Sequence, residues 1–334
     1  MSSISLSNAL VGYGLHMESV MSPHTISDYR RTLRRFADWW NSNGRSPDPD
    51  LDQITPETVR RFLGHWSQVE VRPGGCVPGR EPQRLSAKTI RNMHTALSAF
   101  FSWCVQERYL PADRHPIRGR VPAPPVHRPQ IQPLSVDEIN ALRDAARHSA
   151  AYTTSRGRRA SAEISTGLRN RALLEFLLHT GARASECELL RVRDLDLKAR
   201  TALVHGKGRG RERKPRTVPY GAKCGQILFR YLADRGAVNQ PDAPVFATRS
   251  GGSMTRNAIG LVVKRMGKRA GVPRVHPHLL RHTFAVRYVV EGGDVASLQR
   301  ILGHTDPQMS LHYANLADEH VQLVGRRVNP MDRI

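Results

Sequence analysis

Apolar residues recur at the spacing of an amphipathic helix in three stretches of the first third of the chain. In residues 25 to 43 the apolar positions are Ile26, Tyr29, Leu33, Phe36 and Trp40. A shorter helix is predicted from Thr55, because Pro56 suits the first helical position. A third helix is predicted from Ser86 through Leu110. Together these stretches predict a small helical domain.

Two stretches rich in proline and glycine interrupt this pattern. Residues 71 to 84 predict a loop, because proline and glycine disfavour regular elements. Residues 111 to 133 contain seven prolines, which is typical of an extended, semi-rigid tether. We therefore expect an N-terminal domain over residues 1 to 112, a linker over 113 to 133 and a second domain over 134 to 334.

The second domain begins with a predicted helix over residues 134 to 148. Ser135 is its expected cap, and Glu138 follows three residues on, as in a capping box. Residues 149 to 167 are mostly small and polar, so they predict a surface loop. The helical spacing of apolar residues resumes over residues 168 to 180.

Gly181 is expected to end that helix, because glycine readily forms a left-handed cap, and Arg183 then lies just past a helix end. Residues 201 to 206 and 213 to 220 predict two strands around a basic, glycine-rich turn, and the chain from residue 223 onward returns to helix. The predicted fold class is mainly α with a small β-sheet, made of a helical N-terminal domain and a mixed, mostly helical second domain.

The charge of the chain favours nucleic acid as its partner. The 51 lysines and arginines exceed the 29 acidic residues, which leaves a net charge of +22 and a pI near 10.9. No run of about 20 apolar residues predicts a membrane span, and the first residues lack the basic and apolar regions of a secretory signal. We expect a cytoplasmic, nucleoid-associated protein with no membrane partner.

The cysteines and histidines do not predict a metal site. No CxxC pair occurs among Cys76, Cys104, Cys187 and Cys224, so neither a zinc ribbon nor a disulfide framework is indicated. No basic neighbour in sequence marks Cys187 as a nucleophile. Three clustered histidines could be metal ligands, namely His276, His278 and His282. No residue of another ligand type is spaced nearby to complete a zinc site. We expect no metal and no other cofactor.

Two arginines are candidates for gripping a phosphate. A planar guanidinium can hold two non-bridging oxygens of a phosphodiester that is under attack. Arg183 is followed three residues later by Glu186, which can brace it from the same helical face, although a plain surface pair has the same spacing. His278 and Arg281 are also three residues apart, so one helix would offer a base and a guanidinium fork.

A run of basic residues lies between the two predicted β-strands. Its members are Lys207, Arg209, Arg211, Arg213, Lys214 and Arg216. Such a run is commonly a solvated face, but at the tip of a hairpin it can enter a DNA groove. The glycines of this turn permit a close backbone approach to DNA, and Lys207 could donate a proton to a leaving oxygen. Three basic residues of the first helix are further candidates for DNA contact: Arg30, Arg31 and Arg34.

A tyrosine follows these groups near the end of the chain. Gly303 is expected to close a helix and to leave His304 at its end, and a further helix from Asp306 and Pro307 would bring Tyr313 to the site. A lone tyrosine is more often a core residue than a nucleophile. An ordinary phenol has a pKa near ~10, so attack at neutral pH requires a base and cationic neighbours.

The chain resembles the tyrosine recombinases of the phage integrase family over residues 134 to 320, in the order and local context of six residues: Arg183, Lys207, His278, Arg281, His304 and Tyr313. The motifs that carry the resemblance are TGARASE, HGKG, HxLRHTFA and LGH followed nine residues later by tyrosine. The N-terminal helices are similar to the core-binding, SAM-like domain of that family, by pattern and position.

The resemblance implies a site-specific DNA recombinase that works without metal or ATP. Tyr313 would form a 3′-phosphotyrosine intermediate, and the residues that would hold the scissile phosphate are Arg183, Arg281 and His304. Lys207 would be the general acid and His278 the general base, with Glu186 in support. Four protomers would act on two double-stranded DNA sites, for DNA integration and excision or transposon mobility, with chromosome-dimer resolution as another possible setting.

Two other functions fit the same residues less well. A type IB topoisomerase would share the chemistry but relax DNA without defined sites, and a non-catalytic DNA-binding regulator would use the site residues only as structure. RNA is disfavoured as substrate, because a 2′-hydroxyl could displace the phosphotyrosine. Residues 71 to 84 and 149 to 167 look longer than in simpler family members, and the segment before residue 25 is short for an arm-binding domain.

Overall fold

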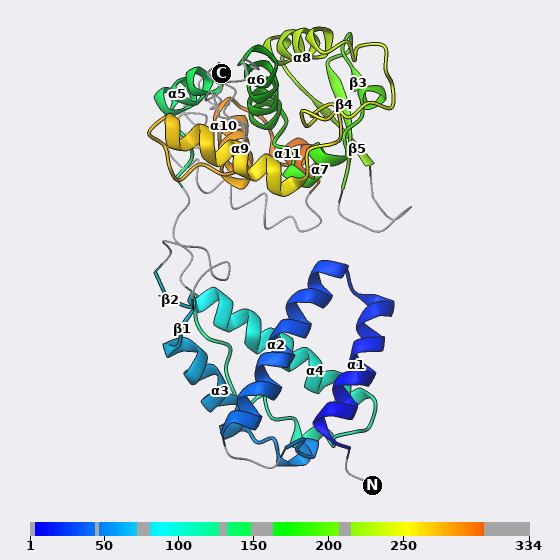
Figure 1. Ribbon diagram of the computed structural model, residues 1–334, viewed down its shortest axis with the longest axis vertical. Helices are drawn as coiled ribbons and strands as arrows, with labels where there is room; N and C mark the ends of the chain where they lie inside the picture. The colour runs from blue at the N-terminus through cyan, green and yellow to red at the C-terminus, as the bar shows by residue number, and fades with distance from the viewer. Residues whose placement is uncertain are drawn as a thin grey trace, which may run out of the picture. The chain divides into compact units, whose positions relative to one another are not determined.

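The computed structural model describes residues 4–43, 47–71, 81–126, 132–147, 163–206 and 215–303, with the side chains of the helix that begins at Glu163 described from residue 166. The chain divides into two compact units, Met1–Pro129 and Gln130–Ile334 (Figure 1). The division falls inside the segment expected to be a linker.

The first unit extends past residue 112, where the sequence analysis places the end of the N-terminal domain. Two apolar residues of the proline-rich segment, Ile117 and Val121, are buried in the core of this unit, with exposed fractions of 2% and 6%. Burial of these side chains removes apolar surface from water and fixes the first part of the segment to the helices. The part of the segment around Ile117 and Val121 is therefore not a tether.

The first unit is helical, as predicted. Its helices are α1 (Leu6–Val20), α2 (Pro23–Ser42), α3 (Pro56–Gln68) and α4 (Ala87–Gln106). The side chains of Ser22, Thr55 and Ser86 accept hydrogen bonds from the first turns of α2, α3 and α4, which satisfies amide groups that have no partner inside the helix. The predicted starts at Thr55 and Ser86 are therefore confirmed.

The first unit differs from the prediction at the end of one helix and in elements that were not predicted. Helix α4 ends at Gln106 and not at Leu110, because Arg108 has a φ of 60° and the amides of Tyr109 and Leu110 turn back to the carbonyl of Cys104. Helix α1 was not predicted. A two-residue pair, β1 (Glu70–Val71) with β2 (Gln83–Arg84), lies at the two ends of the stretch predicted as a loop.

The core of the first unit is rich in aromatic rings. Phe36 of α2 meets Phe62 of α3 edge to face, with ring centroids 5.1 Å apart and an interplanar angle of 83°. Phe100 of α4 makes a similar contact with Tyr13 of α1 at 5.4 Å. These contacts join helices that are distant in sequence, so the apolar faces read from the helical pattern do form one core.

The second unit combines helices with a small sheet. Its helices are α5 (Val136–Arg147), α6 (Glu163–Thr180), α7 (Ala184–Leu189), α8 (Ala222–Asp234), α9 (Arg256–Arg269), α10 (Pro277–Val290) and α11 (Val295–Leu302). Three antiparallel strands lie in the order β3 (Leu195–Asp196), β4 (Thr201–His205) and β5 (Pro215–Pro219). The predicted fold class, mainly α with a small sheet, is confirmed.

Some details of this unit correct the sequence analysis. Residues 163 to 167 belong to α6 and not to a loop, whereas residues 148 to 162 lie outside the described part of the chain. The segment from 235 to 255 is not helical, because Gly236 ends α8 with a φ of 66° and the chain then pairs locally. Strand β3 was not predicted.

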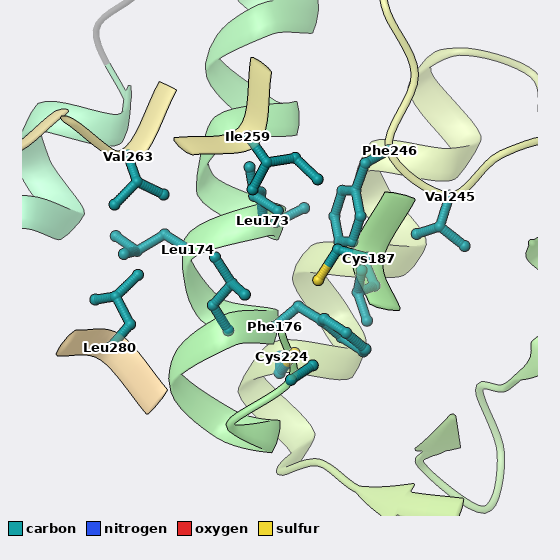
Figure 2. Packing of buried hydrophobic residues seen from close by; sticks show 14 of the residues in the cluster. Leu173, Leu174, Phe176, Cys187, Cys224, Val245, Phe246, Ile259, Val263 and Leu280 are labelled. Atoms are coloured by element: carbon teal, nitrogen blue, oxygen red, sulfur yellow. The ribbon is translucent and has the colours of Figure 1, made fainter. Parts of the chain in front are cut away.

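Helix α6 is the centre of the second unit. It packs against α5, α8 and α10, and its residues from Ala172 to Leu174, with Phe176 and Leu177, are fully buried. Because α6 has such neighbours on several sides, most of its length is removed from water. Figure 2 shows Leu173, Leu174 and Phe176 among side chains of the neighbouring segments. The C-terminal end of α6 is therefore held rigidly, and Arg183 follows it.

No helix among the described residues is long and apolar enough to cross a lipid bilayer.

Candidate active site

The site begins at the C-terminal end of α6, in the sequence TGAR. Gly181 has a φ of 60°, as predicted for a left-handed cap. A Cβ atom on Gly181 would lie 2.6 Å from the Phe284 ring and 2.8 Å from the Leu302 side chain. The hydroxyl of Thr180 accepts a hydrogen bond from the amide of Ala182 at 3.1 Å and fixes the turn. Glycine thus lets α10 and α11 approach the end of α6.

Arg183 lies at the first turn of the next helix. It is the N-cap of α7, and its backbone amide donates to Oε2 of Glu186 at 2.8 Å. One of its terminal nitrogens, Nη1, donates to Oε1 of the same carboxylate at 2.9 Å. The side chain of Arg183 remains 29% exposed, while that of Glu186 is only 1% exposed. Glu186 therefore braces a guanidinium that can still reach a substrate.

Helix α10 supplies the second arginine. Pro277 occupies its first turn, as predicted, with His276 at the N-cap. Arg281 is buried, and its Nη1 donates to the carbonyl oxygen of Gly181 at 2.7 Å. His278 lies one turn before Arg281 and is exposed. The two residues share a helix as expected, and only the histidine faces solvent.

The C-terminal end of α11 brings the two arginines together. Nη2 of Arg281 donates to the carbonyl oxygen of Leu302 at 2.7 Å, and Nη1 of Arg183 approaches the same oxygen at 3.5 Å. Cationic side chains are favourable here, because the last carbonyl groups of a helix have no partners within it. Gly303 follows with a φ of 63° and ends the helix, as predicted. His304 is the next residue in the sequence.

Arg216 of β5 is a third arginine in this cluster. Its Nη1 and Nη2 donate to the two oxygens of Glu186 at 2.8 and 2.9 Å, and its Nε donates to the carbonyl oxygen of Ile301 at 2.6 Å. In the sequence, Arg216 belongs to the basic run that starts at Lys207, and it was not predicted as a site residue. The signal was available in the strand alternation, which places Arg216 on the same face as the buried Val218.

The carboxyl of Glu186 is held in its ionised form. Its burial alone would raise its pKa, but the hydrogen bonds and charge of Arg216, together with the backbone amide and charge of Arg183, outweigh burial and keep the pKa below its usual value. Arg183 and Arg216 share this single carboxylate, and Arg281 lies beside Arg183 at the carbonyl oxygen of Leu302, so the cluster carries a net positive charge. An anionic group such as a phosphodiester would be attracted to it.

A second basic surface lies on α9, which packs against α7. The amide of Arg256, at the start of α9, donates to Oε2 of Glu188 in α7 at 2.9 Å. Helix α9 has no acidic residue, and its exposed basic side chains are Arg256, Lys264, Arg265, Lys268 and Arg269. This surface was not predicted, although its basic residues alternate with apolar positions at helical spacing.

Several predicted site residues lie outside the described residues: Lys207, Arg209, Arg211, Arg213, Lys214, His304 and Tyr313. The three predicted DNA contacts of the first unit are on α2 and are exposed: Arg30, Arg31 and Arg34. Arg30 is paired with Glu18, and Arg31 with Asp28. Ion pairs between exposed side chains contribute little, so a phosphate can displace these carboxylates.

No group of three or more metal-ligating side chains comes together in the described part of the chain. The buried Cys187, next to Glu186, does not qualify as a nucleophile, because burial raises the pKa of its thiol well above the usual range. The described site is therefore an arginine cluster on a buried carboxylate, with an exposed histidine on α10.

Comparison with known proteins agrees with this geometry. Residues 134–320 match the model described as the phage integrase family, and residues 12–108 match its N-terminal SAM-like domain. The chain belongs to the phage integrase family. The tyrosine recombinase XerC of Xanthomonas axonopodis pv. citri (strain 306) is 31% identical over 96% of this chain and 95% of its own length. The tyrosine recombinase XerD of Corynebacterium glutamicum is 30% identical over 95% of this chain and 95% of its own length.

The family's fold is also found among solved structures. The Tn1549 transposon integrase, solved in complex with transposon right end DNA, matches with a TM-score of 0.70 at 18% identity, covering 98% of this chain and 100% of that one. The XerH recombinase bound to a palindromic difH substrate matches with a TM-score of 0.63 at 20% identity, covering 92% of this chain and 80% of the XerH chain. As a phage integrase family member with these relatives, the protein is a site-specific DNA recombinase.

Proposed function

We propose that this recombinase cuts and rejoins DNA through a covalent 3′-phosphotyrosine formed by Tyr313. The observation that carries the proposal is the convergence of Arg183 and Arg281 on the carbonyl oxygen of Leu302, two residues before His304. Two guanidinium groups held at one point match the needs of a phosphodiester that gains charge on its non-bridging oxygens during attack.

In the proposed cleavage step the phenolic oxygen of Tyr313 attacks the scissile phosphorus. The bond between phosphorus and the 5′ oxygen breaks as the new ester forms. Arg183, Arg281 and His304 stabilise the non-bridging oxygens. The exposed His278 accepts the phenolic proton as general base, and Lys207 donates a proton to the departing 5′ oxygen. In rejoining, a 5′-hydroxyl attacks the phosphotyrosine and releases the tyrosine.

The basic surfaces support the proposed binding of double-stranded DNA. The exposed side chains of α9 lie on a helix that packs against α7, the helix that begins after Arg183. We assign this surface to DNA next to the scissile phosphate. The basic run from Lys207 to Lys214 and the arginines of α2 would extend the contact along the backbone. We further assign the active form to four protomers on two DNA sites.

We assign the reaction to DNA integration and excision or transposon mobility. The DNA that flanks the gene tests this setting, because inverted repeats at the boundary of an inserted element are expected on either side of it. A gene embedded in ordinary chromosomal sequence, with a single target site elsewhere on the chromosome, would contradict the assignment and favour resolution of chromosome dimers.

A plasmid assay tests the proposed reaction and separates it from the two alternatives. The target duplex is first selected from a random pool by binding to the full-length protein and is then cloned twice into a supercoiled plasmid. We expect recombination between the two copies and none with Tyr313→Phe. Relaxation of plasmids that lack the site would favour a type IB topoisomerase, and binding with neither product would favour a regulator.

A further inference from the structure

We propose that Arg216 is a positioning residue of the cleavage reaction, which holds Arg183, through Glu186, in register with the end of α11. The inference deepens the proposed function and rests on it. Arg216 belongs to β5, which pairs with β4, and the basic run that contains Lys207 connects the two strands in sequence. The side chain of Arg216 thus links the pair of strands β4 and β5 to α7 and α11.

The strand register explains why Arg216 points inward. Arg216 pairs with Val204 of β4, and both Val204 and Val218 are fully buried. Successive side chains of a strand face opposite sides, so residues 216 and 218 share the inner face. The side chain of Arg216 is only 12% exposed. A basic residue in this position is part of the interior and not of the DNA-facing surface.

The three contacts of Arg216 require the shape of a guanidinium group. Its two terminal nitrogens hold both oxygens of Glu186, while its Nε holds the carbonyl oxygen of Ile301. A lysine at this position would carry the same charge on a single nitrogen and could not maintain the fork and the third bond together. The geometry is therefore set by hydrogen-bond directions as well as by charge.

Gly303 provides an independent observation. A Cβ atom at this position would lie 3.1 Å from both Cδ and Nη1 of Arg216. Glycine at 303 thus serves two purposes, since it permits the φ of 63° that ends α11 and it leaves room for the guanidinium of Arg216. The segment that leads to His304 is shaped around this arginine.

The contacts also show how Arg216 would act on Arg183. Glu186 is buried, and its charge is shared between Arg216 and Arg183. Without Arg216, Arg183 would be the sole cation paired with this carboxylate among the described residues. A desolvated carboxylate attracts its counterion strongly, so Arg183 would be drawn toward Glu186 and away from a phosphate. Arg216 leaves Arg183 available to the substrate.

An ion pair elsewhere in the same unit serves as a matched control. Arg143 of α5 holds both oxygens of the fully buried Glu175, at 3.0 and 3.1 Å. This pair resembles that of Arg216 with Glu186 in shape and burial, but the other ion-pair partners of Glu175 are Arg171 and His179 of its own helix and not the arginines of the site. Arg143→Met therefore breaks a comparable fork without touching the site.

The experiment compares Arg216→Met, Arg216→Lys and Arg143→Met in the full-length protein with the selected DNA duplex. It measures the melting temperature, the affinity for DNA and the rate of covalent adduct formation at saturating DNA. We expect Arg216→Met to slow adduct formation about 100-fold, as displacement of a catalytic group by about 1 Å does, with DNA affinity unchanged. Arg216→Lys should recover part of the rate. Arg143→Met should lower the melting temperature as much as Arg216→Met does, but its rate of adduct formation should stay within about twofold of the wild-type rate.

A double variant adds a second criterion. In the Glu186→Gln background, where the buried carboxylate is absent, Arg216→Met should cause a much smaller further loss, because residues that act as a unit have non-additive effects. Equal rates for Arg216→Met and Arg143→Met would overturn the inference while the wild-type adduct still upholds the proposed function. A wild-type protein that forms no adduct would overturn both.

Discussion

Arg183 and Arg281 donate to one and the same acceptor, the carbonyl oxygen of Leu302, at 3.5 and 2.7 Å. Arg183 is the N-cap of α7, Arg281 lies in the second turn of α10, and the acceptor is the last residue of α11. Their meeting point depends on the close approach of these helices at Gly181. The proposed phosphate grip therefore depends on the packing of the second unit.

Replacing Arg281 with lysine should slow cleavage strongly. Lysine keeps the charge but cannot hold the carbonyl oxygens of Gly181 and Leu302 while presenting a fork to a phosphate. We expect a loss of about 100-fold or more in the rate of adduct formation, with little change in DNA affinity. The matched control is Arg274→Lys, which replaces a more exposed arginine of the same unit whose Nη2 donates to both oxygens of Glu138. A similar loss in both variants would contradict a specific role for Arg281.

Gly181→Ala should impair both folding and cleavage. The alanine would have to adopt a positive φ, and its Cβ would collide with Phe284 and Leu302. We therefore expect a loss of about 3 kcal/mol in unfolding free energy. Gly236→Ala is the control, because Gly236 has a similar φ of 66° and no atom within 4 Å of the added Cβ. It should cost only about 1 kcal/mol. Equal costs in urea unfolding would argue against tight packing at Gly181.

The stability of the second unit should fall at acidic pH through Glu175. Burial alone would raise the pKa of Glu175, but hydrogen bonds from His179 and Arg143 and the charges of Arg143 and Arg171 lower it to about 2. Because this pKa is depressed on folding, the contribution is present above the ordinary value of 4.5 and is lost as pH falls toward 2.

Urea unfolding between pH 7 and pH 3 measures this contribution. Glu175→Gln should cost about 3 kcal/mol at pH 7, and the difference from wild type should shrink below pH 4.5, where the wild type loses its advantage. Glu57→Gln removes an exposed carboxylate and should change stability little at any pH. If the difference in unfolding free energy between wild type and Glu175→Gln stays constant with pH, the charge of the Glu175 carboxylate is not its cause.

Lys207→Ala tests the proposed general acid. The variant should cleave ordinary DNA about 100-fold more slowly or worse. Substituting sulfur for the bridging 5′ oxygen should restore most of the rate, because a thiolate, with a pKa near ~8.5 for its thiol, departs without a proton donor. Arg209→Ala, in the same basic run, should gain nothing from sulfur. If the loss with Lys207→Ala is equally large on both substrates, Lys207 has a different role.

Local signals predicted much of the fold and part of the site. The caps at Thr55, Ser86 and Ser135 and the glycine ends at Gly181 and Gly303 follow from chemistry within a few residues, and the structure has each of them. The same signals placed Arg183 just past a helix end and His278 one turn before Arg281.

Features that depend on contacts between distant segments were missed. Helix α1 contains Gly12 and Gly14, which weaken helix propensity, and it is stabilised by packing, since Gly12 allows the Trp103 ring to approach within 3.0 Å of where a Cβ would be. Strand β3 has two residues and exists through its pairing with β4. Arg216 was read as part of a charge run, because its partners on α7 and α11 are remote in sequence.

The attachment of DNA to Tyr313 is the most direct test of the account. A duplex with a nick next to the cleavage position releases its short 5′-hydroxyl fragment and traps the covalent intermediate. Mass spectrometry of the digested adduct should find a 3′-phosphate joined to the peptide that contains Tyr313, and Tyr313→Phe should form no adduct. DNA joined to another residue or through a 5′-phosphate, or an adduct that persists in Tyr313→Phe, would contradict it.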